Sequence, residues 1–152
     1  MVSVRSIFQA IIDGVHAISP ATWPDRNFSF EPNSLLKKPD EWISLQSRSF
    51  RDCCLYLSGY PLSTNAYCYS SIFVELMIFY PLSVATDELQ ALMIEDALSI
   101  QNAIGRHPET WGGADSITFL GQQPYEFETL TDDNGDSIAI VFSIPMEVVI
   151  RL

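Results

Sequence analysis

Histidine, cysteine and basic residues are scarce in this chain, and each shortage narrows the possible functions. The 152 residues include two histidines, three cysteines and eight lysines or arginines. Cys53, Cys54 and Cys68 have no Cys-x-x-Cys spacing and no neighbouring histidine, a pattern that fits neither a zinc site nor a disulfide framework. We interpret them as small apolar residues in a reducing compartment. At most one of Cys53 and Cys54 is expected in the core, because neighbouring strand residues face opposite sides.

The sequence also has no long hydrophobic run. Its most apolar stretch, residues 72–82, contains Glu75 and Pro81 and is about half as long as a membrane-spanning helix. Near the first residue, Gln9 and Asp13 interrupt the apolar positions before they reach the length of a signal-peptide core. We therefore predict no membrane role and no secretion signal.

Basic residues are almost missing from the second half of the chain. The formal charge of -11 arises from 19 acidic and 8 basic residues. Residues 1–74 hold six of each, so residues 75–152 hold thirteen acidic residues against Arg106 and Arg151. An acidic surface repels phosphate, which argues against wrapping nucleic acid. Two interpretations stay open: charge for solubility, or an acidic wall along which DNA slides without sticking.

Familiar catalytic, cofactor and metal motifs are missing too, so we predict no catalytic residue, no cofactor and no metal site. No glycine pattern cradles a phosphate, and no serine lies in a Gly-x-Ser-x-Gly elbow. Asp132, Asn134 and Asp136 have part of the spacing of a calcium loop, but Ser143 stands at the twelfth position, where such a loop needs glutamate. We therefore predict an exposed hairpin tip at these residues.

Apolar residues that recur every three or four positions predict two helices. The first covers residues 3–18, with Ser3 as its N-cap, and Pro20 and Pro24 follow it. The second covers residues 86–104, with acidic residues in its first turn, where the helix dipole favours them.

Aromatic and branched residues predict strands at 48–57 and 71–80, and strand-rich segments at 117–130 and 137–151 joined by an Asn-Gly hairpin. The order is α-β-β-α-β-β, which predicts an α+β fold with a mostly antiparallel sheet of about four strands and two helices on one face. We expect one domain over residues 1–152, with a long irregular loop at about 19–47.

The strand at 71–80 is apolar on both faces, with Glu75 as its one clearly polar residue. Such a strand needs cover on both sides, from helices on one and from another layer or another subunit on the other. Phe73, Met77 and Phe79 point to the second side and are therefore candidate subunit-interface residues.

Four segments carry a resemblance to a known family: residues 48–50, 74–80, 92–104 and 148–152. Together with the order of elements, they resemble the tail terminator, or tail completion, proteins of long-tailed bacteriophages. The similarity covers roughly residues 48–152 and, more loosely, the first helix. The chain departs from the family in its proline-bearing segment 19–40.

The resemblance implies a structural virion protein that forms a ring, commonly a hexamer, at the head-proximal end of the tail tube. Such a ring stops tube polymerisation and joins the tube to the head–tail connector or stopper proteins, and DNA passes through it without specific binding. The protein would be assembled in the host cytoplasm and reside in the tail or neck of the virion. The candidate lumen-facing acids are Asp132, Asp133, Asp136, Glu95 and Asp96.

Two alternatives stay open at this point. Within the same class, the chain is a head completion or adaptor protein of the neck. From another class, it is a small α+β enzyme or ligand-binding domain whose site is assembled from isolated residues such as His16, Glu75 or His107.

Overall fold

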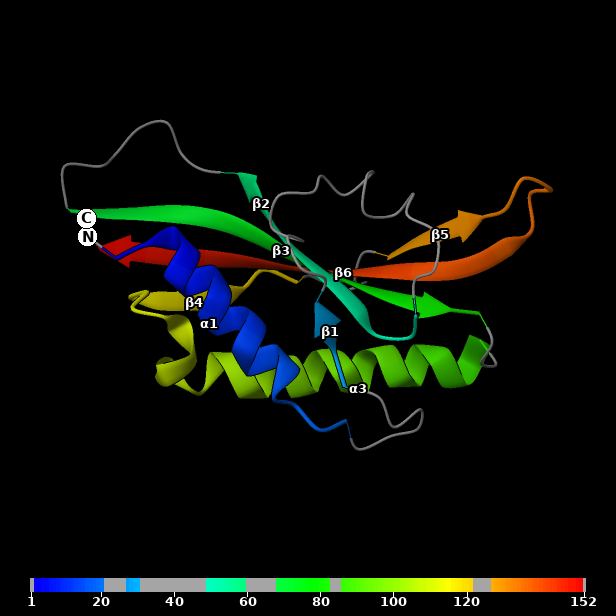
Figure 1. The fold of residues 1–152 in the computed structure, drawn as a ribbon, viewed down its shortest axis with the longest axis horizontal. Helices are drawn as coiled ribbons and strands as arrows, with labels where there is room; N and C mark the ends of the chain where they lie inside the picture. Colours follow the sequence, from blue (N-terminus) through cyan, green and yellow to red (C-terminus); the bar gives the residue numbers. More distant parts are fainter. Residues whose placement is uncertain are drawn as a thin grey trace.

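The computed structural model describes residues 2–20, 27–30, 49–59, 68–82, 86–121 and 127–151. Figure 1 shows an elongated molecule whose helices and strands are coloured in chain order. They are α1 (Val4–His16), β1 (Ser29–Phe30), β2 (Asp52–Gly59), β3 (Tyr69–Pro81), α3 (Thr86–Gly105), the short 3-10 helix η2 (Pro108–Trp111), β4 (Ser116–Phe119), β5 (Phe127–Thr131) and β6 (Ser137–Arg151).

The strands form one six-stranded mixed sheet, which corrects the predicted sheet of about four strands. Its order is β1-β2-β3-β6-β4, and β5 also pairs with β6. β1 runs parallel to β2, whereas the other neighbours are antiparallel. The element order is therefore α-β-β-β-α-β-β-β, leaving out η2, and not the α-β-β-α-β-β predicted from the sequence.

Both additional strands have a physical reason. β1 lies inside the segment that we predicted as an irregular loop at 19–47, and its backbone is held by a hydrogen bond from the Ser29 N–H to the Arg51 carbonyl, at 3.1 Å. Residues 19–20 and 27–28 of that predicted loop are in no helix or strand, and residues 21–26 and 31–47 lie outside the described residues. The single strand predicted at 117–130 is two strands, β4 and β5, because Gly121 and Pro124 between them disfavour a continuous ladder.

β6 is the central strand, and its proline falls where a missing donor costs little. β3 pairs with β6 without a register shift, and Pro145 lies opposite Glu75. On its other side, β6 pairs with β5 as far as Phe142, which lies opposite Phe127. Its pairing with β4 begins at Met146, which lies opposite Phe119. Pro145 lies between these partners, and its carbonyl accepts a hydrogen bond from the Leu120 N–H at 2.9 Å. The proline therefore sits at a short locally unpaired edge within the described sheet.

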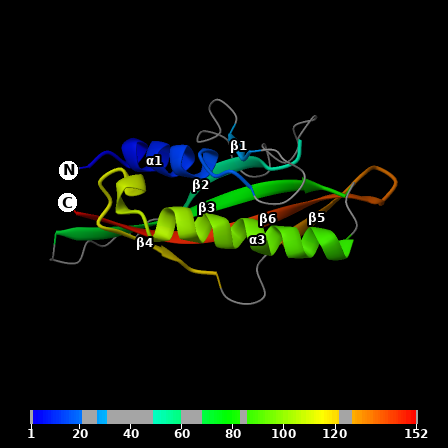
Figure 2. The same ribbon diagram turned by 90° about the horizontal axis from the view of Figure 1, so that it is seen from below.

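Both helices cover the same face of the sheet, as predicted from their apolar stripes (Figures 1 and 2). The main core joins the inward residues of α1 and α3 to alternate residues of β2, β3 and β6. Ser3 is at the N-cap position of α1 but makes no side-chain capping bond. The helix residues in this core are Ile7, Phe8, Ile11, Val15, Leu89, Leu92, Met93, Ala97, Ile100 and Ile104.

The opposite face of the sheet carries a second, small apolar cluster. It consists of Cys54, Met77, Phe79, Ala139 and Val141, and Leu130 packs against it. Cys53 belongs to the main core, so both neighbouring cysteines are buried, on opposite faces. The two cysteines face opposite sides, as expected, but the expectation that at most one of them lies in a core was wrong, because this sheet has a buried cluster on each face.

Candidate functional site

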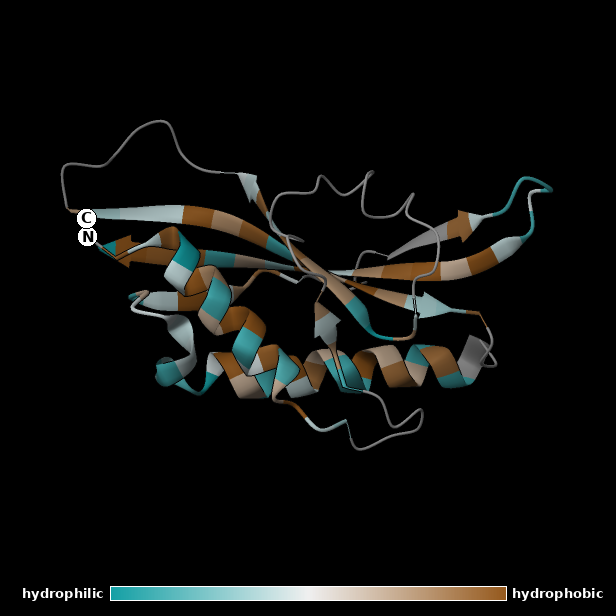
Figure 3. Cartoon of the chain, in the orientation of Figure 1, coloured by the Kyte–Doolittle hydropathy of each residue, from teal (hydrophilic) through white to brown (hydrophobic). Residues whose placement is uncertain are grey.

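The β5–β6 hairpin projects beyond the start of α3 and ends in the predicted acidic tip (Figures 1 and 3). Asp132 is half-buried, whereas Asp133 and Asp136 are exposed. The Asp132 carboxylate accepts hydrogen bonds from the backbone N–H groups of Asn134 and Asp136, each at 2.9 Å. One Asp132 oxygen therefore closes the turn, and the carboxylates of Asp133 and Asp136 extend into solvent.

The backbone of the tip is also closed. The Asp132 N–H donates to the Asp136 carbonyl at 2.9 Å, and the Gly135 N–H donates to the Asp132 carbonyl at 3.0 Å. Gly135 has a φ of 81°, a conformation that favours glycine. These bonds make the tip a defined acidic loop, and they explain the spacing of Asp132 and Asp136 without a bound cation.

Charge is distributed unevenly along the molecule. α1 begins and β6 ends at the same end of the long axis, and α3 also ends toward it (Figures 1 and 2). The exposed arginines of the described residues belong to these positions: Arg5, Arg106 and Arg151. The hairpin tip lies at the opposite end and carries acidic side chains. The described part of the chain therefore has its exposed arginines at one end and an acidic loop at the other.

The two acidic residues that we predicted on the second helix have different environments. Glu95 is exposed on α3, as a channel-facing residue would have to be. Asp96 is 2% exposed, and its carboxylate is used inside the protein. The expectation that Asp96 contributes to an acidic wall was wrong, because its neighbours in space, not its neighbour in sequence, determine its role.

Asp96 forms a two-pronged ion pair with Arg51, a residue that directly precedes β2. The Arg51 Nε donates to Asp96 Oδ2 at 2.7 Å, and the Arg51 Nη2 donates to Oδ1 at 2.9 Å. The Tyr80 hydroxyl donates to Oδ2 at 2.7 Å. Arg51 is fully buried, so the pair lies in an environment where each charge depends on its partner.

Aromatic rings enclose this buried pair. The Arg51 guanidinium carbon lies 5.2 Å from the ring centre of Phe50 and 5.6 Å from that of Phe28. Phe50 also packs edge-on against Tyr80, with ring centres 5.4 Å apart. The cluster thus joins the residues next to β1, the start of β2, the end of β3 and the middle of α3. Its geometry is that of a structural clamp, because the Asp96 side chain is 3% exposed and both of its carboxylate oxygens accept hydrogen bonds inside the protein.

The predicted subunit-interface residues lie on the sheet face away from the helices. Phe73 is half-buried, whereas Met77 and Phe79 are 6% and 8% exposed and belong to the small second cluster. Residues of the same chain therefore cover much of the second apolar face of this strand, which the sequence analysis expected another layer or another subunit to cover. Phe73 is the most accessible of the three.

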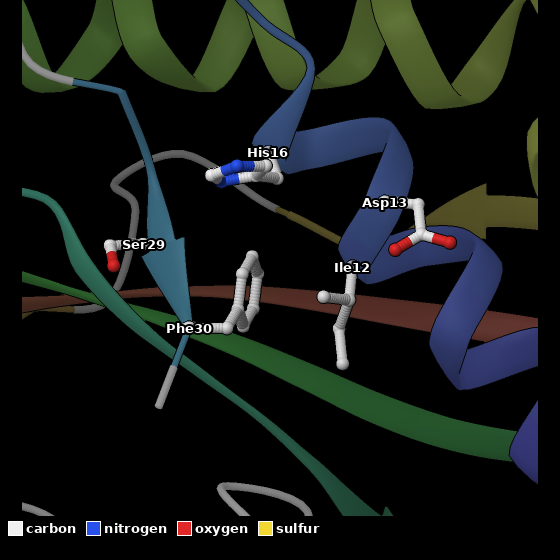
Figure 4. A pocket seen from close by; sticks show the side chains of 5 residues that line it. All are labelled: Ile12, Asp13, His16, Ser29 and Phe30. Atoms are coloured by element: carbon white, nitrogen blue, oxygen red, sulfur yellow. The ribbon is translucent and has the colours of Figure 1, made fainter. Parts of the chain in front are cut away.

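A small pocket lies between α1 and β1, with a volume of about 220 Å³ and a lining of Ile12, Asp13, His16, Ser29 and Phe30 (Figure 4). The His16 Nδ1 is 2.8 Å from the Phe28 carbonyl oxygen. Because that oxygen can only accept, Nδ1 carries the hydrogen and Nε2 of a neutral ring is left as an acceptor. The imidazole of His16 and the carboxylate of Asp13 do not point toward each other, and Gln9 Nε2 donates to Asp13 Oδ1 at 2.8 Å.

The other residues considered for a catalytic site are separate from this pocket. Glu75 accepts a short hydrogen bond from the Ser143 hydroxyl across the β3–β6 pair. His107 and Glu109 form an exposed pair at 2.9 Å. A backbone hydrogen bond and the His107 side chain lower the pKa of Glu109. The structure therefore does not bring His16, Glu75 and His107 into one site.

The buried thiol of Cys53 and the acidic residues offer little chemistry within the described segments. Burial, followed by the charge of Asp52, raises the pKa of Cys53 well above its ordinary value, so this thiol stays protonated and poorly nucleophilic. In the described residues, no three histidine, cysteine, aspartate or glutamate side chains gather closely enough to hold a metal ion. No helix in the same segments is both long enough and apolar enough to span a membrane.

Sequence reasoning missed Arg51 and Tyr80. Arg51 has a φ of 61°, a left-handed conformation that no turn motif in the sequence predicts. Its partner Asp96 lies 45 residues away in the chain. One signal was available: an aspartate on the apolar side of a helix needs a buried partner. Asp96 lies three residues after Met93 and four before Ile100, both of which are core positions.

Comparisons with known proteins add no relatives. No protein-family model matches the chain, and no curated protein matches it at a significant level. The resemblance seen in the sequence therefore stays a prediction.

Proposed function

We propose that this chain is a ring-forming structural subunit of a bacteriophage tail, the tail terminator at the head-proximal end of the tail tube. In this role it caps tube polymerisation and joins the tube to the head connector. The observation that carries the proposal is the closed acidic hairpin at the end of the molecule opposite the exposed arginines Arg5, Arg106 and Arg151. The proposal also relies on the resemblance of residues 48–152 to tail terminator proteins.

An acidic loop suits a channel through which DNA passes. Phosphates bind where lysine and arginine replace their counterions, and they are repelled by carboxylates. Asp133 and Asp136 are exposed, and Asp132 holds the turn that presents them. Arranged around a ring, several such hairpins would form a negatively charged wall that does not trap DNA.

The interior of the domain also supports a structural role. The buried polar residues Arg51, Asp96 and Tyr80 are engaged with one another and not with a cavity. They hold α3 against the start of β2 and the end of β3. A rigid domain of this kind suits a subunit whose surfaces must fit neighbours on several sides.

Native mass spectrometry and electron microscopy of the purified chain test the proposal directly. We expect a closed ring, commonly of six copies, or a monomer that forms one when tail tube protein is added. The ring should stop elongation of tubes in a polymerisation assay. A chain that stays monomeric with tube and connector proteins, and leaves tube length unchanged, would contradict the proposal.

A head completion or adaptor protein of the neck would share the ring but differ in its neighbour. Such a protein would bind the connector and leave tube elongation unchanged. Comparing tube length with connector binding therefore separates the two roles.

The pocket beside His16 favours one function of a different class, the binding of a small molecule. Its lining combines Ile12 and Phe30 with the hydrogen-bonding groups of His16 and Ser29. Crystallographic fragment soaking would test this alternative. A ligand seated at His16 in a chain that forms no ring would favour a binding domain over a tail protein.

A further inference from the structure

The outer face of α3 carries apolar residues that the chain itself does not cover. Ile94 is 46% exposed and Leu98 is 54% exposed, and Ala91 is exposed as well. These positions follow one another by three and four residues, which places them in one line along the helix. We call Ala91, Ile94 and Leu98 the outer stripe of α3. It lies opposite the helix side that packs in the main core.

Acidic residues accompany this stripe, and basic ones do not. Glu88 and Glu95 are both exposed and lie seven residues apart, on one flank of the stripe. The sequence of α3, Thr86–Gly105, contains no lysine, arginine or histidine. A surface that covers the stripe must therefore combine apolar side chains with positive charge. Pairing two copies through α3 alone would place glutamates against glutamates, which is unfavourable.

The end of the molecule where both described termini lie has the complementary features. Val4 is 41% exposed and Tyr69 is 42% exposed, and Arg5 and Arg151 next to them are exposed. Tyr69 is the cross-strand partner of Arg151. Val4 and Arg5 open α1, whose start lies close to the end of β6 in both views (Figures 1 and 2).

These four residues lie on both faces of the sheet at this end, Val4 and Arg5 on the helix face and Tyr69 and Arg151 on the opposite face. α1 covers the helix face of the sheet, whereas Tyr69 and Arg151 alternate with core residues Ile72 and Ile150 and so point to the other face. We call Val4, Arg5, Tyr69 and Arg151 the terminal surface.

We propose that the outer stripe of α3 in one copy docks on the terminal surface of the next copy. Each surface supplies exposed apolar residues, and Arg5 and Arg151 of the terminal surface are opposite in charge to Glu88 and Glu95 beside the outer stripe. The contact joins two different patches, so it is head-to-tail, and a head-to-tail contact closes into a ring when its rotation allows. This docking rests on the proposed function, because it assigns the subunit contact of the proposed ring.

The decisive experiment mixes two charge-reversed variants of the full chain. The first variant, Glu88→Arg/Glu95→Arg, makes the outer stripe basic and leaves the terminal surface unchanged. The second, Arg5→Glu/Arg151→Glu, makes the terminal surface acidic and leaves the stripe unchanged. All four side chains are exposed, so both variants should fold, and circular dichroism with a thermal melt checks this.

We expect each variant alone to need at least about tenfold more protein for half-assembly, measured by analytical ultracentrifugation. An equimolar mixture should assemble again, because each altered surface then meets an oppositely charged one on the other variant. The control Asp133→Arg/Asp136→Arg reverses two exposed acids at the hairpin tip, the same total change of charge as in the first variant, and should leave the assembly unchanged.

The outcomes separate this docking from the proposed function. A wild-type ring whose assembly none of these variants weakens would overturn the docking and leave the tail role intact. Loss of connector or tube binding, with the ring unchanged, would also overturn it and assign the outer stripe to a different protein. A wild-type chain that is monomeric alone and with tube and connector proteins would overturn both proposals.

Discussion

Arg51 and Asp96 meet in the interior of the protein through two parallel hydrogen bonds, at 2.7 and 2.9 Å. One residue precedes β2 and the other lies in the middle of α3, so the pair fixes how the helix sits on the sheet. Paired geometry of this kind satisfies a planar guanidinium and a carboxylate together. Removing a buried charge costs stability mainly because its partner is then left without compensation.

We therefore expect Asp96→Asn and Arg51→Met each to lower the free energy of unfolding by about 3–5 kcal/mol. The double variant Arg51→Met/Asp96→Asn should lose less than the sum of the two, because no buried charge is left unpaired. Urea unfolding measures all three. Glu109→Gln is a control that breaks the exposed pair with His107 and should leave stability unchanged. Additive losses in the double variant would refute the coupling.

Tyr80 predicts how stability depends on alkaline pH. Burial, followed by the charge of Asp96, raises the pKa of Tyr80 well above its ordinary value of about 10. A group whose pKa is raised on folding contributes stability that is fully present below the pKa of the unfolded chain. That stability is lost as the pH rises above about 10 toward the folded-state pKa.

The urea midpoint of the wild-type protein should therefore fall between pH 8 and pH 11, and it should fall less steeply in Tyr80→Phe. At pH 8 the same variant should be less stable by about 1–3 kcal/mol, because Asp96 Oδ2 loses a buried donor. Midpoints at several pH values measure both effects. Parallel pH profiles for the two proteins would show that Tyr80 does not carry this dependence.

Local sequence patterns were sufficient for the helices and for most of the strand positions. The spacing of Ile7, Ile11 and Val15 predicted α1, and the Asn-Gly turn predicted the β5–β6 hairpin. Both signals come from residues close together in the chain. The predicted exposed tip likewise follows from local turn chemistry.

What the sequence did not reveal depends on distant partners. β1 is two residues long, and it exists as a strand because Ser29 bonds to Arg51 across the chain. Asp96 was read as a surface acid because its partners Arg51 and Tyr80 are 45 and 16 residues away. The exposure of the outer stripe on α3 also needed the structure, because Ala91, Ile94 and Leu98 lie outside the apolar stripe that predicted the core side of the helix, and spacing does not show whether another element covers them.

Two glycines allow a matched test of close packing. Gly112 has a φ of 60°, and a Cβ there would lie 2.5 Å from the Ser6 carbonyl oxygen. Gly135 has a φ of 81°, and a Cβ there would meet nothing within 4 Å. Both alanine variants carry the left-handed penalty of about 1–2 kcal/mol. Gly112→Ala should cost clearly more, because α1 must shift away from η2. Equal losses in thermal melts of the two variants would argue against this contact.

The hairpin tip contains one acid that closes the turn, Asp132, and two exposed acids that the proposed function places in the channel, Asp133 and Asp136. Asp132→Ala removes the acceptor for two backbone N–H groups and should cost about 0.5–2 kcal/mol, the range of comparable capping bonds. Hydrogen exchange at the amides of Asn134 and Asp136 should then become faster. Asp133→Ala should leave both amides protected, because its side chain is exposed and no capping bond to these amides comes from it.

For DNA passage, the informative variant is Asp133→Lys/Asp136→Lys, which keeps Asp132 and hence the turn. In the proposed channel, lysines would bind phosphates, so DNA ejection should slow although particles assemble normally. The isolated ring should also gain affinity for duplex DNA that weakens as salt rises. The neutral variant Asp133→Asn/Asp136→Asn should fall between the lysine variant and the wild type. Ejection at the wild-type rate, together with no gain in DNA affinity, would reject the hairpin as part of the channel wall.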